Sequence, residues 1–156
     1  MQYHNFAMHF NEDLVSFQFK TMKKLLSTQY HAISFNIAML TLRLFAGILM
    51  MSHGYDKLLH FSEKKAVFHN FLGLGTTNSL LLVIFAEFFC ALFVMIGLFT
   101  RLVAVPLIIV MTVAVFEIHQ MDFFQTGEKA SLFLSIFITL LLCGPGKASI
   151  DGIAGK

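Results

Sequence analysis

The chain has 156 residues, of which 57% are hydrophobic and only 13% charged, and its mean hydropathy is +0.76. This composition places it among multi-span integral membrane proteins before any motif is considered. The net charge of +2 is too small and too scattered along the chain to argue for nucleic-acid binding.

The first element in chain order is an amphipathic segment that precedes the apolar spans. Between residues 14 and 30, apolar side chains recur on one helical face, and Lys20, Lys23 and Lys24 lie on the opposite side. This pattern is typical of a helix that lies on a membrane surface; a soluble tail is the alternative. We therefore predict an amphipathic N-terminal segment, residues 1–33, followed by a membrane domain, residues 34–156.

Four apolar runs follow, each near the length of about 20 residues that a bilayer-spanning helix needs. They cover residues 34–52, 80–100, 102–118 and 128–143. Short connections make consecutive helices antiparallel, so the predicted fold is all-α, an integral membrane four-helix bundle. The longer connection after the first span contains a predicted surface helix over residues 62–72, with Ser62 as its N-cap.

The distribution of basic residues predicts the orientation, because Lys and Arg are enriched in cytoplasmic loops. The bias is modest and favours both termini in the cytoplasm. We expect the membrane to be the inner membrane of a bacterium. The side assigned to the cytoplasm carries Lys20, Lys23, Lys24, Arg101, Lys147 and Lys156, and the other side carries Lys57, Lys64, Lys65 and Lys129.

Two charged residues, Arg43 and Glu87, interrupt the first and second apolar runs. A charge at membrane depth costs several kcal/mol, so such residues usually face the bundle interior, find a partner and mark function. Counting about 1.5 Å per residue from the predicted span ends puts the two at similar depths. We therefore predict a direct or water-bridged Arg43–Glu87 pair; the alternative is that the pair only fixes the register of the helices.

Further polar residues gather where three spans end on one membrane face. We predict that four of them, His53, Glu117, His119 and Glu128, surround an opening that leads to the two buried charges. Histidines there could titrate near neutral pH and relay protons; ordinary interfacial positions are the alternative. Phe88 is among the aromatic residues that could line a pocket for a lipophilic ligand beside Glu87. The polar residues are His53, Tyr55, Lys57, Glu117, His119 and Glu128.

The spacing of these residues does not favour metal or thiol chemistry. It lacks the short-range His and Glu signatures of metal sites, so no metal site is predicted. The two cysteines, Cys90 and Cys143, form no CxxC motif and are interpreted as small apolar residues of the spans.

From about residue 42 to residue 152 the sequence resembles the DoxX family of small four-span membrane proteins. The resemblance depends on the order and spacing of several short motifs rather than on any one of them. These are Arg43, the His53-Gly54-x-x-Lys57 motif, Glu87, residues 97–101 (GLFTR), His119, residues 127–130 (GEKA), Gly144-Pro145-Gly146, Ser149 and Asp151.

The resemblance implies a membrane partner in a redox system, since relatives include a subunit of a thiosulfate:quinone oxidoreductase. On this hypothesis a quinone binds in the bundle, Arg43 polarises its carbonyl oxygen, Glu87 holds Arg43 or exchanges a proton, and His119 and His53 connect the site to water. No haem, flavin or iron–sulfur motif is present, so we expect a redox partner protein to supply electrons. Self-association as a homo-oligomer is compatible with this reading.

Two other classes of function remain open from the sequence. One is a non-catalytic membrane scaffold or assembly partner, in which the buried charges only set helix packing. The other is a small transporter, for which the sequence offers no internal repeat or broken helix. Whether the protein is an enzyme at all is not readable from these residues.

Overall fold

The computed structural model describes residues 17–18, 22–23, 29 and 31–155, and the contacts divide the chain into two units, Met1–His31 and Ala32–Lys156. The predicted amphipathic helix falls for the most part outside the described residues. The elements described below all belong to the second unit. Within its described residues every regular element is a helix.

Helix α2 (Ala32–Leu59) is the longest element of this unit. Its buried residues recur every three or four positions, which places them on one face of the helix. Two of them are glycines that let a neighbouring backbone come close. A Cβ at Gly47 would lie 2.8 Å from Met95 Cβ, and one at Gly54 would lie 2.6 Å from the Phe88 amide nitrogen. Small residues on the face of a helix allow this close contact.

The helix that packs against this glycine face has three consecutive parts, α4 (Thr76–Ile84), η2 (Phe85–Cys90) and α5 (Ala91–Ile96). The middle part, η2, is π-helical. The pairing of Gly47 with Met95 and of Gly54 with Phe88 makes this helix antiparallel to α2. Gly97 ends it in a left-handed conformation, with φ of 74°.

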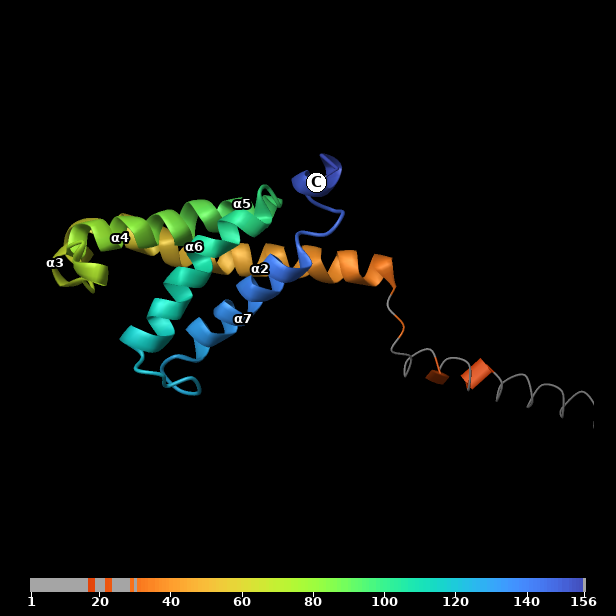
Figure 1. Cartoon of the computed structure of the whole chain (residues 1–156), viewed down its shortest axis with the longest axis horizontal. Coiled ribbons are helices and arrows are strands. Elements are labelled where there is room, and N and C mark those ends of the chain that lie inside the picture. The colour runs from red at the N-terminus through yellow and green to blue at the C-terminus, as the bar shows by residue number, and fades with distance from the viewer. Residues whose placement is uncertain (1–16, 19–21, 24–28, 30, 156) are drawn as a thin grey trace, which may run out of the picture. The chain divides into compact units, whose positions relative to one another are not determined.

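The other two long helices form a hairpin that runs obliquely across the first pair (Figure 1). Helix α6 (Thr100–Val113) continues into the π-helical η3 (Ala114–Ile118), and α7 (Glu128–Cys143) returns along it. The core between the two pairs is apolar and includes fully buried Leu107, Phe137 and Leu140.

Three short helices complete the unit. Helix α3 (Phe61–Val67) and the 3-10 helix η1 (Phe71–Gly73) connect α2 to α4, and α8 (Ile150–Ile153) lies near the C-terminus. Helix α3 has no buried residue and no side-chain N-cap, and its cap position is His60. The prediction that Ser62 caps this helix is therefore wrong.

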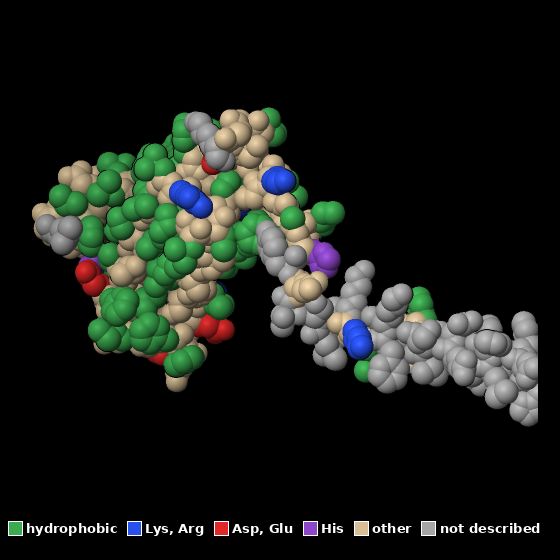
Figure 2. Space-filling model, turned by 45° about the vertical axis from the view of Figure 1, so that its right-hand side comes forward, with side chains coloured by type: hydrophobic (Ala, Val, Ile, Leu, Met, Phe, Trp, Pro, Cys, Tyr) green, Lys and Arg blue, Asp and Glu red, His purple; other side chains and the backbone are tan. Residues whose placement is uncertain are grey.

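In the part of the chain that the structure describes, three helical segments are long and apolar enough to cross a membrane: Ala32–Leu59, Thr76–Ile96 and Thr100–Ile118. Figure 2 shows hydrophobic side chains over much of the visible surface of these helices. Such exposure is unusual for a protein in water and expected of one whose solvent is lipid. The all-α membrane bundle that the sequence predicts is confirmed. Strongly exposed apolar residues on the long helices include Phe45, Leu102 and Leu142.

The ends of the helices differ from the predicted spans in two places. Helix α2 continues to Leu59, so His53 and Lys57, which we expected at a span end, lie on continuous helix. The turn between the second and third long helices falls at residues 97–99, inside the predicted span 80–100, because Gly97 ends α5 and Thr100 already begins α6. The last predicted span, residues 128–143, has the same bounds as α7.

Candidate functional site: an apolar cavity beside a buried ion pair

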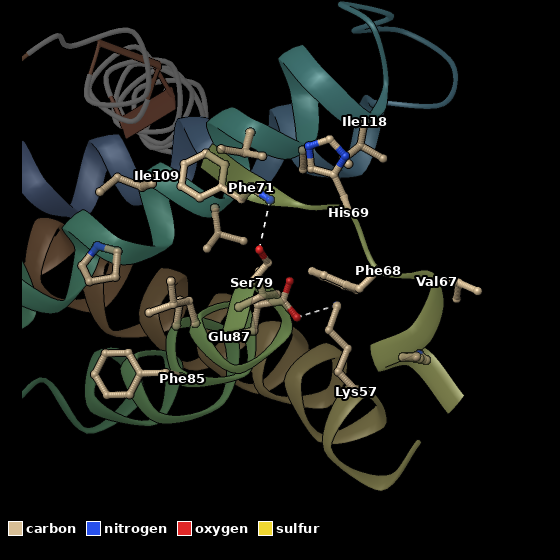
Figure 3. A pocket seen from close by; sticks show the side chains of 18 residues that line it. Lys57, Val67, Phe68, His69, Phe71, Ser79, Phe85, Glu87, Ile109 and Ile118 are labelled. Atoms are coloured by element: carbon tan, nitrogen blue, oxygen red, sulfur yellow. Dashed lines mark hydrogen bonds and ion pairs between the residues drawn. The ribbon is translucent and has the colours of Figure 1, made fainter. Parts of the chain in front are cut away.

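A cavity of about 750 Å³ lies between the α3–η1 connection, the α4–η2 helix and the α6–η3 helix (Figure 3). Its walls are mainly apolar side chains. Both π-helical segments contribute to them, η2 through Phe85 and Ala86 and η3 through Ala114 and Ile118. A π-helical turn inserted in an α-helix is often found at a functional site, and here two of them face one cavity.

The most polar part of the cavity wall is an ion pair between α2 and η2. Lys57 Nζ lies 2.6 Å from Glu87 Oε2, and Figure 3 shows the two side chains pointing toward each other. The Glu87 side chain is only 6% exposed and that of Lys57 21%. A buried carboxylate needs a cation or several hydrogen-bond donors to offset its desolvation, and Lys57 provides the cation.

The local sequence explains how Lys57 reaches Glu87. Gly54 and Lys57 are three residues apart and therefore lie on the same face of α2. Because Gly54 has no side chain, the α2 backbone approaches η2 at Phe88, next to Glu87. The lysine one turn further along α2 then lies opposite the carboxylate. The Gly54-x-x-Lys57 spacing therefore places Lys57 within reach of Glu87.

Two polar contacts hold the α3–η1 side of the cavity. The Ser79 hydroxyl oxygen accepts a hydrogen bond from the Phe71 amide at 3.0 Å. His69 Nε2 lies 2.8 Å from Glu117 Oε2, which joins the connection to η3. The His69–Glu117 contact is exposed, so it contributes little stability, but it brings the two walls together at the surface.

Arg43 is not at this cavity, and the predicted Arg43–Glu87 pair is wrong. Arg43 is 2% exposed, and its guanidinium donates to three backbone carbonyls: Nη1 to Pro145 at 2.7 Å, and Nη2 to Ala148 at 3.1 Å and to Met95 at 3.3 Å. Lys57, which pairs with Glu87, lies fourteen residues further along α2, a rise of about 21 Å. The two buried charges therefore belong to separate clusters.

The Arg43 cluster fastens residues 144–153, which we call the C-terminal segment, to the turn between α5 and α6. The Asp151 carboxylate accepts hydrogen bonds from the Phe99 amide at 3.0 Å and the Thr100 amide at 2.9 Å. It thereby caps the N-terminus of α6, where a negative charge is favourable. Asp151 also attracts the Arg43 guanidinium electrostatically. At Gly97 a Cβ would lie 2.6 Å from Arg43 Nη1, so only glycine fits.

The other predicted site residues divide between the surface of the bundle and the loop between α6 and α7. His53 makes an edge-to-face contact with Phe133, and Tyr55 stacks on Phe88 with ring centroids 6.3 Å apart. None of these four side chains lines the cavity. Their predicted roles in ligand binding remain predictions without support from the cavity geometry.

His119, the third predicted catalytic residue, ends the η3 helix beside the loop that leads to α7. A Cβ at Gly127 would lie 3.2 Å from His119 Cβ, so His119 is close to the start of α7, and it is not among the residues that line the cavity. Glu128 begins α7 and is exposed. Hydrogen bonds from Thr126 and Gln125 lower the pKa of Asp122 and close this loop. The predicted opening formed by His53, Glu117, His119 and Glu128 is therefore not the cavity that the structure contains.

Lys57 and Glu87 are both candidate residues in the sequence, but their pairing was not predicted, and neither were several residues of the lining. Phe68, His69 and Phe71 come from the connection between the first two spans, which carried no strong motif. Ser79 is hidden in an apolar run. The Lys57–Glu87 pair did have a signal in the sequence. Gly47 and Gly54 lie on the same face of α2 as Lys57, and such a glycine face indicates where a neighbouring helix packs. Among the described residues, no group of three His, Cys, Asp or Glu side chains is placed to hold a metal ion.

These features define a polytopic α-helical membrane protein with an apolar cavity and a buried ion pair in its wall. The family model for DoxX matches residues 38–120, more than half of the chain. The protein therefore belongs to the DoxX family. No curated protein and no solved structure matches the chain significantly.

Proposed function

We propose that this DoxX-family protein is a component of a membrane redox system and binds a lipophilic ligand, a quinone, in the cavity beside Lys57 and Glu87. The observation that carries the proposal is the cavity itself. Its volume of about 750 Å³ is within the range of small-molecule sites, and apolar walls with a few convergent polar groups are typical of such sites.

The ion pair gives the cavity the groups that quinone chemistry requires. Lys57 Nζ would donate a hydrogen bond to a carbonyl oxygen, and Glu87 would exchange a proton with the ligand. Reduction of a quinone takes up protons as well as electrons, and in this proposal a redox partner protein supplies the electrons. We further propose the bacterial inner membrane as its location, with both termini in the cytoplasm.

A quinone should stabilise the protein against heat, because a ligand that binds only the folded state raises the free energy of unfolding. We expect a water-soluble short-chain quinone to raise the Tm of the detergent-purified protein. Replacing the cavity residue Val110 with phenylalanine should abolish this rise, whereas V105F, on the outer face of the same helix, should keep it. Differential scanning fluorimetry over a quinone titration measures both effects.

The alternative function is that of a scaffold without a ligand, and one observation favours it. Arg43 donates to backbone carbonyls and lies beside Asp151, and these contacts give most of the family motifs in the Arg43 cluster a role in folding. A parent protein whose Tm does not respond to any quinone, or responds equally in V110F, would favour the scaffold over the quinone site.

A further inference from the structure

The charged residues that line the cavity are each matched by a partner of opposite charge or by a hydrogen-bonding group. Lys57 pairs with Glu87 at 2.6 Å. Lys64, the other lysine of the lining, pairs with Asp56 at the end of α2. His69 contacts Glu117 at 2.8 Å. Counted together with Asp56 and Glu117, which lie outside the lining, the charged groups around the cavity therefore carry no excess of positive charge.

This arrangement disfavours a ligand that carries a negative charge. An anionic head placed beside Lys57 would also lie beside the Glu87 carboxylate, and the two negative charges would share one cation in an apolar surrounding. Burying a charge without a partner costs several kcal/mol even after relaxation. An anionic lipid would thus have to displace Glu87 or leave its own head unpaired.

An uncharged head meets no such penalty. An ammonium group has three N–H donors, and among the described residues Lys57 donates to Glu87 Oε2 alone. A carbonyl or hydroxyl oxygen can accept from Lys57 while the ion pair stays in place. Most of the other lining residues, among them Phe85, Ile109 and Val113, are apolar and suit a hydrocarbon tail.

We propose that the cavity selects an electrically neutral lipophile with a hydrogen-bond-accepting head over an anionic one, and that Glu87 sets this selectivity by neutralising Lys57. The inference rests on the proposed function, since it concerns the ligand of the same cavity. It assigns Glu87 a role in specificity that is separate from any part in proton exchange.

Two photoactivatable probes with the same alkyl chain test the proposal, one ending in an alcohol and the other in a sulfonate, which stays ionised at every working pH. Each is added to the full-length protein in neutral detergent, and labelled peptides are quantified by mass spectrometry. In the parent protein, the alcohol probe should label cavity residues at least about tenfold more than the sulfonate probe does, because burying an unpaired charge is costly.

Substituting Glu87→Gln removes the negative charge of this side chain while keeping its shape. Lys57 is then left without its carboxylate, and we expect the alcohol preference to fall by at least about tenfold. The matched control is Glu63→Gln, an exposed acid of α3 outside the lining, which should keep the parent ratio. The double change Lys57→Gln with Glu87→Gln restores neutrality and should restore the preference for the alcohol.

The outcomes separate this inference from the function on which it rests. Equal cavity labelling by both probes in the parent, or an unchanged ratio in the folded Glu87→Gln protein, overturns the selectivity while the lipophile site stands. If neither probe labels cavity residues in the parent, the proposed lipophile site fails and the selectivity fails with it. The ratio in the parent alone decides the question if the Glu87→Gln protein does not fold.

Discussion

Replacing Arg43 with methionine should lower the free energy of unfolding by about 3–5 kcal/mol, the range found when one partner of a buried charge network is removed. The change leaves the carbonyls of Met95, Pro145 and Ala148 without their donor and removes the cation beside Asp151. Thermal unfolding in detergent measures the loss as a lower Tm.

Arg101 offers the matched control for this prediction. It is exposed and donates one long hydrogen bond, 3.3 Å, to the Leu142 carbonyl. Arg101→Met should therefore change stability by no more than about 1 kcal/mol. If Arg43→Met instead left the Tm unchanged but weakened quinone binding, Arg43 would belong to the ligand site and the structural interpretation would be wrong.

Lys57 and Glu87 should behave as a coupled pair, with each single change more harmful than the double change. Lys57→Met leaves the Glu87 carboxylate in an apolar wall, and we expect a loss of about 3 kcal/mol, the low end of the range for a broken buried pair because Lys57 is partly exposed. Adding Glu87→Met removes that charge and should recover much of the stability.

A double-mutant cycle on the Tm tests this coupling, and a second cycle serves as its control. Arg43 and Glu87 are in separate clusters, so Arg43→Met and Glu87→Met should be additive to within about 0.5 kcal/mol. The Lys57–Glu87 cycle should show at least about 1 kcal/mol of coupling. The reverse result, coupling to Arg43 and additivity with Lys57, would contradict the pairing in the structure.

Much of the fold could be predicted because it follows from local signals. Apolar length predicts the spans, and Gly144-Pro145-Gly146 marks the end of α7 at Cys143. The end of α2 was harder, because Gly54 and the polar residues around it resemble a turn in the sequence. In the structure Gly54 is a contact point between helices, so α2 continues to Leu59.

The pairing of the buried charges could not be predicted from depth. The depth of each charge was counted from the end of its own predicted span, and the two span ends lie at different heights in the bundle. Helix α2 begins at Ala32, whereas its neighbour turns at residues 97–99 opposite Arg43. Arg43 lies eleven residues, or about 16 Å, after the start of α2. This difference in height between the two helix ends is enough to separate Arg43 from Glu87.

The partners of Arg43 could not be predicted from the sequence around it. They are backbone carbonyls of the C-terminal segment, more than a hundred residues away in sequence. Backbone acceptors have no sequence signature, and the glycines and proline of residues 144–146 are also typical of an ordinary helix stop. Asp151 is similar, since it caps a helix that begins fifty-one residues earlier.

The motifs shared with the family belong to two separate clusters, and the two clusters have different roles. Arg43, residues 97–100 and the C-terminal segment hold the helix ends together at one end of the bundle. About 21 Å away along α2, Gly54 brings α2 close to η2, and Lys57 and Glu87 form the ion pair in the cavity wall. Variants of the first group should report on folding, and variants of the second group on the ligand.

The central claim is that the cavity beside Lys57 and Glu87 holds a lipophile, and the most direct measurement is native mass spectrometry of the protein released from mild detergent. We predict that the parent and V105F retain a neutral lipophile of defined mass and that V110F, equally folded, does not. An adduct of the same mass and abundance on all three proteins, or none on the parent, would contradict the claim.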